Sequence, residues 1–209
     1  MKRNNKTVHL VDDDDAVRHA LSVFLESAGF KICEYSSAAD FLDECASVEG
    51  GVLLLDQRMP GMSGMELQAR LRQLGVFMPI IFITGHGDIQ MSVAAMKAGA
   101  MDFLEKPFDN TELLQSIQEA LNKAENRRRE WVQHCEAERR CSTLTSRELE
   151  VMGYIVQGMS SRAIAEHLGL SNRTIEVHRA RVMTKMAAGS LPELVRMAAM
   201  CKSRFTQGS

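Results

Sequence analysis

The sequence predicts an α/β domain with a five-stranded, parallel, doubly wound sheet, followed by a small all-helical domain. In the first half of the chain, short apolar runs alternate with segments of helical spacing, which is typical of parallel strands covered by helices on both faces. From Thr145 onward, apolar residues recur at helical spacing only, between turns that contain glycine. A chain of 209 residues also has room for two ordinary domains.

Two changes of composition divide the chain into three parts. We expect the α/β domain at 1–122, a helical linker at 123–142 and the helical domain at 143–209. The linker is mostly charged and contains no Gly or Pro, which favours a solvated helix. A loose seven-residue repeat of apolar residues runs into it, so a short dimer-forming coiled coil is the alternative, although Arg128 interrupts the repeat.

Charge is distributed unevenly along the chain. Residues 1–120 contain 10 Lys and Arg against 18 Asp and Glu, whereas residues 121–209 contain 15 against 9. The net charges of the two parts are therefore −8 and +6. This asymmetry indicates that only the second part binds a polyanion such as a nucleic acid.

Cysteine usage and hydropathy bear on the cellular compartment. The five cysteines are odd in number and form no C-x-x-C pair, so reduced thiols explain them better than disulfides or a metal site. The basic start of the chain leads into an apolar run that stops at Asp12, too soon for a signal peptide. No stretch approaches the roughly 20 apolar residues that span a bilayer. We expect a soluble, cytoplasmic protein that does not enter a membrane.

Polar residues follow apolar runs of the first domain. Depending on the run, they carry a carboxylate, a hydroxyl or an ammonium group. If the runs are neighbouring parallel strands, their carboxyl ends meet at one crevice, where open α/β sheets bind ligands. Carboxylates, a hydroxyl and an ammonium would then gather there, a set that suits a divalent cation beside a phosphoryl group. The residues are Asp12 and Asp13, Asp56, Thr84 and Lys106.

The residue types indicate how such a crevice would work. Asp13 and Asp56 would hold Mg²⁺, with Asp12 acting through a water molecule. The carboxylate of Asp56 is the natural nucleophile toward phosphorus, which would give an acyl phosphate. Lys106 would neutralise the incoming charge, and Thr84 would donate a hydrogen bond to it. Each residue alone could be a cap or turn residue, but their order on successive strands favours the site.

The helical domain carries start and stop signals for consecutive helices. Thr145 and Glu148 form a capping box, and Gly158 ends the first helix. Gly169 then turns the chain, and Ser171 caps the next helix. Two helices joined by a short turn that contains glycine form a helix-turn-helix.

The last of these helices has the composition of a recognition helix. Its outward residues Glu176, Val177 and Ala180 would read bases in the major groove. The basic residues are better placed on phosphates, where they add affinity without sequence information. A basic, solvated helix without a ligand is the alternative. The full set of expected DNA contacts is Arg173, Thr174, Glu176, Val177, Arg179, Ala180, Arg181 and Lys185.

Residues 7 to about 122 resemble the receiver domain of a bacterial two-component response regulator. The resemblance lies in the motifs VDDDD, LLLDQRMPGMSGMEL, IIFITGHGD and DFLEKPF. It implies a flavodoxin-like fold and a phosphoryl group that passes to Asp56 from a histidine of a sensor kinase. It also implies that Mg²⁺ is held by Asp13, Asp56 and the backbone carbonyl of Arg58.

The same resemblance implies a conformational switch. The bond between Lys106 and Pro107 is expected to be cis. On phosphorylation, Thr84 is expected to move toward the phosphoryl oxygen and Phe103 to turn inward, changing the surface around residues 88–105. The alternative is that Phe103 is only a core residue.

Residues 143 to about 206 resemble the LuxR-type DNA-binding domain through LTSRELEVM, GMSSRAIAEHLGLSNRTIEVHRARVM and SLPELVRMA. With a receiver, such a domain identifies the NarL/FixJ group of response regulators, and IEVHRARVM is most similar to its FixJ-type branch. The resemblance implies a fourth helix at about 191–201 that supports dimerisation on DNA. It implies a transcription regulator, not an enzyme, that forms a homodimer when phosphorylated or on DNA. Promoter DNA and RNA polymerase are its implied partners.

Three other functions fit the sequence less well. The Walker B strand of a nucleotide-binding enzyme is excluded because no G-x-x-x-x-G-K-[ST] motif precedes Asp56. A phosphatase that uses an aspartyl phosphate requires a second Asp two residues after the nucleophile, where Arg58 stands. A receiver that signals without phosphate, as a constitutive binding module, has no need of the complete acidic set.

Overall fold

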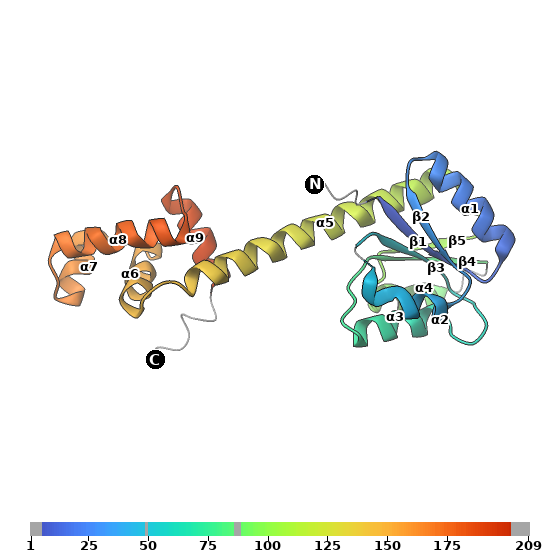
Figure 1. The fold of residues 1–209 in the computed structure, drawn as a ribbon, viewed down its shortest axis with the longest axis horizontal. Coiled ribbons are helices and arrows are strands. Elements are labelled where there is room, and N and C mark those ends of the chain that lie inside the picture. Colours follow the sequence, from blue (N-terminus) through green and yellow to red (C-terminus); the bar gives the residue numbers. More distant parts are fainter. Residues whose placement is uncertain (1–5, 49, 86–88, 202–209) are drawn as a thin grey trace. The chain divides into compact units, whose positions relative to one another are not determined.

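The computed structural model describes residues 6–48, 50–85 and 89–201, and the chain divides into two compact units, 1–127 and 128–209. The first unit is a five-stranded sheet with helices on both faces, and helices make up the described part of the second (Figure 1). The predicted fold class is confirmed.

The five strands are parallel and follow the order β2-β1-β3-β4-β5. The strands are short and rich in Val, Leu and Ile because both faces of the sheet are covered. β1 lies between β2 and β3, so the chain reverses its direction of winding beside β1, at the edge where such sheets bind ligands. The strands are β1 (Thr7–Val11), β2 (Lys31–Tyr35), β3 (Val52–Asp56), β4 (Ile80–Thr84) and β5 (Asp102–Glu105).

Two hydrophobic layers hold the sheet between its helices. Leu25 of α1 and Ile117 of α5 pack on one face, against strand residues such as Leu54. Phe41 of α2 and Leu67 of α3 pack on the other face, together with part of α4. The helices are α1 (Asp15–Ser27), α2 (Ala38–Glu44), a 3₁₀ turn η1 (Cys45–Ser47), α3 (Gly64–Gln73), α4 (Ile89–Lys97) and α5 (Asn110–Cys141).

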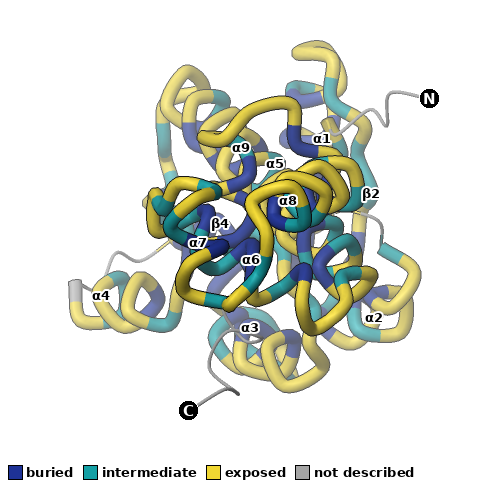
Figure 2. Tube along the Cα trace, turned by 90° about the vertical axis from the view of Figure 1, so that its left-hand side faces the viewer, coloured by how far each residue is buried: buried dark blue, intermediate teal, exposed yellow. Residues whose placement is uncertain are grey.

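The second unit encloses a separate core. Figure 2 shows buried residues on the inner sides of its helices and exposed residues outside. The expected capping box of Thr145 and Glu148 is present, and Gly169 ends α7 with a φ of 65°. The expected fourth helix is α9. The helices are α6 (Ser146–Val156), α7 (Ser161–Leu168), α8 (Asn172–Met186) and α9 (Leu191–Met200).

The expected linker at 123–142 is helical, but its final turns are partly buried. Helix α5 is continuous from Asn110 to Cys141, so the linker extends the last helix of the first unit. Its final turns do not stay in solvent, because Ala137 and Cys141 are 1% exposed and belong to the core of the second unit. Trp131, by contrast, is 66% exposed. The helical unit therefore begins before residue 143.

Candidate functional site

The strand order brings the polar residues at the strand ends to one edge of the sheet. Asp12 follows β1, Asp56 ends β3 and Thr84 ends β4. All three are buried, with exposures of 1%, 6% and 1%. Lys106 follows β5, and the bond from Lys106 to Pro107 is cis, as the receiver resemblance implied.

Lys106 joins the two buried carboxylates. Its Nζ donates to Oδ2 of Asp12 at 2.6 Å and to Oδ1 of Asp56 at 3.0 Å. The second oxygen of Asp56 accepts the backbone N–H of Arg58 at 2.7 Å, and the second oxygen of Asp12 accepts that of Asp14 at 2.9 Å. Each carboxylate is thus fixed in orientation by the chain segment that follows it.

The electrostatics of this edge follow from burial. Burial raises the pKa of Asp56, the ammonium of Lys106 opposes that rise, and the nearby carboxylate of Asp12 adds to it. Burial alone would lower the pKa of Lys106, but its hydrogen bonds to Asp12 and Asp56 outweigh burial and raise it. Two carboxyl groups share one ammonium at this edge, a composition that favours a further cation.

The turn after β3 is shaped by glycine. A Cβ on Gly64 would lie 2.5 Å from the backbone oxygen of Asp56 and 2.9 Å from the ring of Phe82. Helix α3 begins at this glycine, with Ser63 as its N-cap. Because only glycine permits this approach, α3 packs directly against the carboxyl end of β3.

The expected metal ligands are only partly brought together. Asp12 and Asp56 converge on Lys106, whereas Asp13 is exposed. Across residues 6–48, 50–85 and 89–201, no three His, Cys, Asp or Glu side chains are grouped as metal ligands. The chain leaves the strand here, and Asp14 already caps α1 with its side chain. The donor set still suits Mg²⁺, which commonly uses one or two carboxylates and retains several waters.

The expected switch residues lie beside the sheet. Phe103 is half-buried against the layer that contains α2, α3 and α4. Its ring centroid lies 6.3 Å from that of Phe82. Phe103 thus packs on the apolar layer beside β4. Asp88, at the start of the expected switch surface, lies outside the described residues.

Sequence reasoning missed Arg18 of α1. Its guanidinium donates to the backbone carbonyl of Asp12 and is ion-paired with Asp15. The signal that could have found it is spacing, since Arg18 and Asp15 are three residues apart on a helix. The link to Asp12 depends on how the loop folds back, which no sequence pattern shows.

Helix α8 divides into buried and exposed faces as expected. Ile175, Val182 and Met186 are buried in the core of the second unit. Val177 is 45% exposed although it is apolar, as a base-contacting residue would be. The other expected DNA contacts that are exposed are Arg173, Glu176, Ala180 and Arg181, whereas Thr174 and Arg179 are half-buried.

Lys185 differs from the expected phosphate contact. Its Nζ donates to Oε2 of Glu148 at 2.6 Å and to the backbone oxygen of Thr143 at 3.1 Å. Glu148 is 2% exposed, whereas the side chain of Lys185 is 34% exposed, so the pair joins a buried carboxylate to a half-buried ammonium. The ammonium of Lys185 thus holds α8 to the start of α6.

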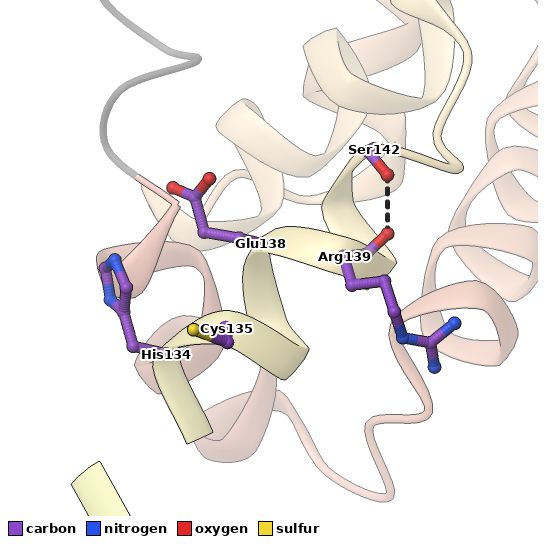
Figure 3. Close-up of a pocket in the computed structure, with 5 residues that line it drawn as sticks. All are labelled: His134, Cys135, Glu138, Arg139 and Ser142. Atoms are coloured by element: carbon purple, nitrogen blue, oxygen red, sulfur yellow. Dashed lines mark hydrogen bonds between the residues drawn. The ribbon is translucent and has the colours of Figure 1, made fainter. Parts of the chain in front are cut away.

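A surface hollow of about 430 Å³ lies at the end of α5, lined by His134, Cys135, Glu138, Arg139 and Ser142 (Figure 3). Arg139 is ion-paired with Glu136, and the hydroxyl of Ser142 donates to the backbone oxygen of Arg139 at 2.6 Å. The hollow belongs wholly to the second unit, and the buried acidic edge remains the better chemical site.

Two family models match the chain. The model described as the response regulator receiver domain matches residues 8–118, and that of bacterial regulatory proteins of the luxR family matches residues 142–198. The chain belongs to the two-component response regulators. Its helical domain is the DNA-binding domain of LuxR-type transcription regulators.

Relatives named as regulators match over most of their length. The transcriptional regulatory protein FixJ of Azorhizobium caulinodans is 47% identical over 91% of this response regulator and 90% of the relative. FixJ of Rhizobium meliloti is 46% identical over 92% and 94%. The tetrathionate response regulatory protein TtrR of Salmonella typhimurium is 43% identical over 91% and 90%. The predicted resemblance to FixJ-type regulators is confirmed.

Solved structures agree with this membership. The response regulator StyR superposes with a TM-score of 0.81 at 42% identity, covering 92% of this chain and 98% of StyR. Full-length FixJ from B. japonicum superposes with a TM-score of 0.61 at 41% identity, covering 95% and 98%. Within the described part of this response regulator, no helix is both long and apolar enough to cross a bilayer.

Proposed function

We propose that Asp56 is the phosphoacceptor of this response regulator, that Mg²⁺ is its cofactor, and that phosphorylation controls promoter binding by α8. The observation that carries the proposal is the ammonium of Lys106 between the carboxylates of Asp12 and Asp56. A buried carboxylate beside a half-buried ammonium is placed to accept a phosphoryl group, because the ammonium remains to offset its charge once the acyl phosphate has formed.

The chain's own residues account for the transfer. A carboxylate oxygen of Asp56 attacks phosphorus, the bond from phosphorus to the histidine nitrogen of a sensor kinase breaks, and that nitrogen takes up a proton. Lys106, whose pKa is raised, stays charged and donates to the phosphoryl oxygens. Thr84, at the end of the adjacent strand, supplies a hydroxyl, and with Phe103 it would change conformation afterwards.

Mg²⁺ would be held by Asp56, Asp12 and Asp13, with the backbone carbonyl of Arg58. When bound, the ion supplies positive charge that offsets the negative charge of the phosphoryl oxygens. Asp13 would have to turn in from its exposed position in the loop between β1 and α1.

Promoter recognition would rest on the exposed face of α8. Glu176, Val177 and Ala180 would contact base edges. Arg173 and Arg181 would contact phosphates, with Thr174 and Arg179 beside them. We expect a homodimer when the protein is phosphorylated or on DNA, contact with RNA polymerase, a cytoplasmic location and no enzymatic activity on small molecules.

The test is the substitution Asp56→Asn in the full-length protein. It should abolish labelling by acetyl phosphate in the presence of Mg²⁺ and remove the effect of acetyl phosphate on binding to genomic DNA fragments. Asp43→Asn, at an exposed position of α2, is the matched control and should label like the wild type. Labelling of the Asp56 variant at the wild-type level would reject the assignment.

A further inference from the structure

Arg18 holds the acidic loop at two points. Its Nη1 donates a hydrogen bond of 2.6 Å to the backbone carbonyl of Asp12, and its Nη2 is ion-paired with the carboxylate of Asp15. The side chain of Arg18 is only 13% exposed, whereas that of Asp15 is 91% exposed. A guanidinium with little exposure that donates to a backbone carbonyl is restrained in its orientation.

The carbonyl of Asp12 connects Arg18 to the backbone of the acidic loop. It is part of the peptide plane between Asp12 and Asp13, so a hydrogen bond to it restrains the backbone of both residues. The carboxylate of Asp12 in turn accepts Lys106 at 2.6 Å and the N–H of Asp14 at 2.9 Å. Arg18 is therefore linked to the buried carboxylate pair through a rigid peptide group.

We propose that Arg18 is a positioning residue for phosphoryl transfer, which fixes the peptide between Asp12 and Asp13 and thereby holds the carboxylate of Asp12 beside Lys106 and Asp56, where Mg²⁺ would bind. This inference rests on the proposed function of Asp56. It also accounts for a basic residue in the first turns of a helix, where the macrodipole disfavours positive charge.

Charge and positioning predict opposite effects on cation binding. Arg18 lies beside the run of carboxylates from Asp12 to Asp15, so loss of its charge alone would strengthen the binding of Mg²⁺. Loss of its hydrogen bonds would instead free the loop. Residues that orient metal ligands typically change metal affinity by about 10- to 100-fold when mutated. Weaker Mg²⁺ binding is thus a result that charge alone does not produce.

The experiment measures the Mg²⁺ concentration at half-saturation in two ways, with the full-length chain. The first is the rise in thermal midpoint of the unphosphorylated protein with Mg²⁺, and the second is the Mg²⁺ dependence of labelling by acetyl phosphate. Arg18→Met should raise half-saturation about tenfold in both, at the lower end of the range for such residues. Arg18→Lys keeps the charge but has one nitrogen for two acceptors. Its Mg²⁺ concentration at half-saturation should therefore lie between those of the wild type and Arg18→Met.

Two controls separate the contacts of Arg18. Asp15→Asn removes the ion pair but leaves the bond to Asp12, and should stay within about twofold of the wild type because exposed ion pairs contribute little. Arg70→Met removes an exposed arginine of α3 that bonds only locally, to Gln73, and should match the wild type. Circular dichroism checks that each variant is folded.

The outcomes keep the two proposals apart. Unchanged or lower half-saturation in Arg18→Met would overturn the role of Arg18 while labelling of Asp56 stood. If that variant is unfolded, Arg18→Lys decides by the same criterion. If the wild type is not labelled at Asp56, the proposed function fails, and the thermal measurement still tests Arg18 as a residue that orients the Mg²⁺ loop.

Discussion

The buried carboxylate of Glu148 has two partners that belong to different elements. It accepts the ammonium of Lys185 from α8 at 2.6 Å and the backbone N–H of Thr145 at the start of α6 at 2.9 Å. The ion pair with Lys185, followed by the hydrogen bond from Thr145, lowers the pKa of Glu148 to about 2. One side chain thus caps one helix and holds the recognition helix against it.

We predict that Glu148→Gln destabilises the helical unit at neutral pH by about 1–3 kcal/mol, since Lys185 loses its charged partner. Because the pKa of Glu148 is lowered on folding, its contribution is fully present above pH 4.5 and is lost as pH falls toward about 2. The free energies of unfolding of variant and wild type, measured by denaturant titration, should therefore differ at pH 7 and converge near pH 2. Glu150→Gln, from an exposed pair with Arg147, should change stability by less than about 0.5 kcal/mol. A difference that does not depend on pH would contradict the assignment.

Whether the position of a single residue could be predicted depended on its neighbours in the sequence. Asp56, Thr84 and Lys106 could be predicted because each follows an apolar strand, and parallel strands end at one edge. The pairing of Lys185 with Glu148 could not be predicted. The two residues lie 37 positions apart, and the capping box already accounts for the presence of Glu148. Asp13 was expected in the crevice because it follows the first strand closely and matches the receiver motif, but the strand ends at Val11 and Asp13 is exposed.

Helix α8 separates its two expected tasks by face. Its buried residues hold the helix in the unit, and its exposed face carries Glu176, Val177 and Ala180 together with Arg173 and Arg181. Base contacts and phosphate contacts can be distinguished experimentally because only phosphate contacts release counterions.

We predict that Arg181→Ala weakens binding to genomic fragments about equally for all sequences. It should lower the slope of log affinity against log salt concentration by about one, as expected for one lost phosphate contact. Glu176→Gln should instead change which fragments are preferred. Arg139→Ala on α5, paired with Glu136, is the control and should leave the slope unchanged. These quantities come from binding titrations at several salt concentrations, and a preserved slope in Arg181→Ala would remove that residue from the phosphate-binding set.

Helix α5 shows why the linker was harder to predict than the sheet. Its charged residues predicted a solvated segment, and its apolar repeat pointed to Trp131, which is 66% exposed. The residues that anchor it in the second unit, Ala137 and Cys141, are small and lie among charged neighbours. Four-residue spacing of two small residues carries little hydrophobic signal, so only the three-dimensional packing reveals them.

At the scale of the whole molecule, each hydrophobic cluster of the described residues lies within one of the two units. One unit surrounds the sheet with two layers, and the other encloses a single helical core. The acidic and basic parts of the sequence coincide with these units, apart from residues 121–127 in the middle of α5. Both the number of domains and the charge of each could be predicted from composition, because neither depends on tertiary detail.

Separate cores predict two unfolding transitions. Mg²⁺ should raise the midpoint of the receiver transition only, by an amount equivalent to about 2.7 kcal/mol at a concentration about 100 times its Kd. Glu148→Gln should lower the midpoint of the helical unit only. Differential scanning calorimetry of the full-length protein, with Mg²⁺ and with EDTA, measures both midpoints. If Mg²⁺ and the substitution shift one common transition, the cores unfold as a single cooperative unit and α5 couples them energetically. If they shift different transitions, neither core's stability depends on the other, and phosphorylation acts on DNA binding through association, either of the two units or of two copies of the chain.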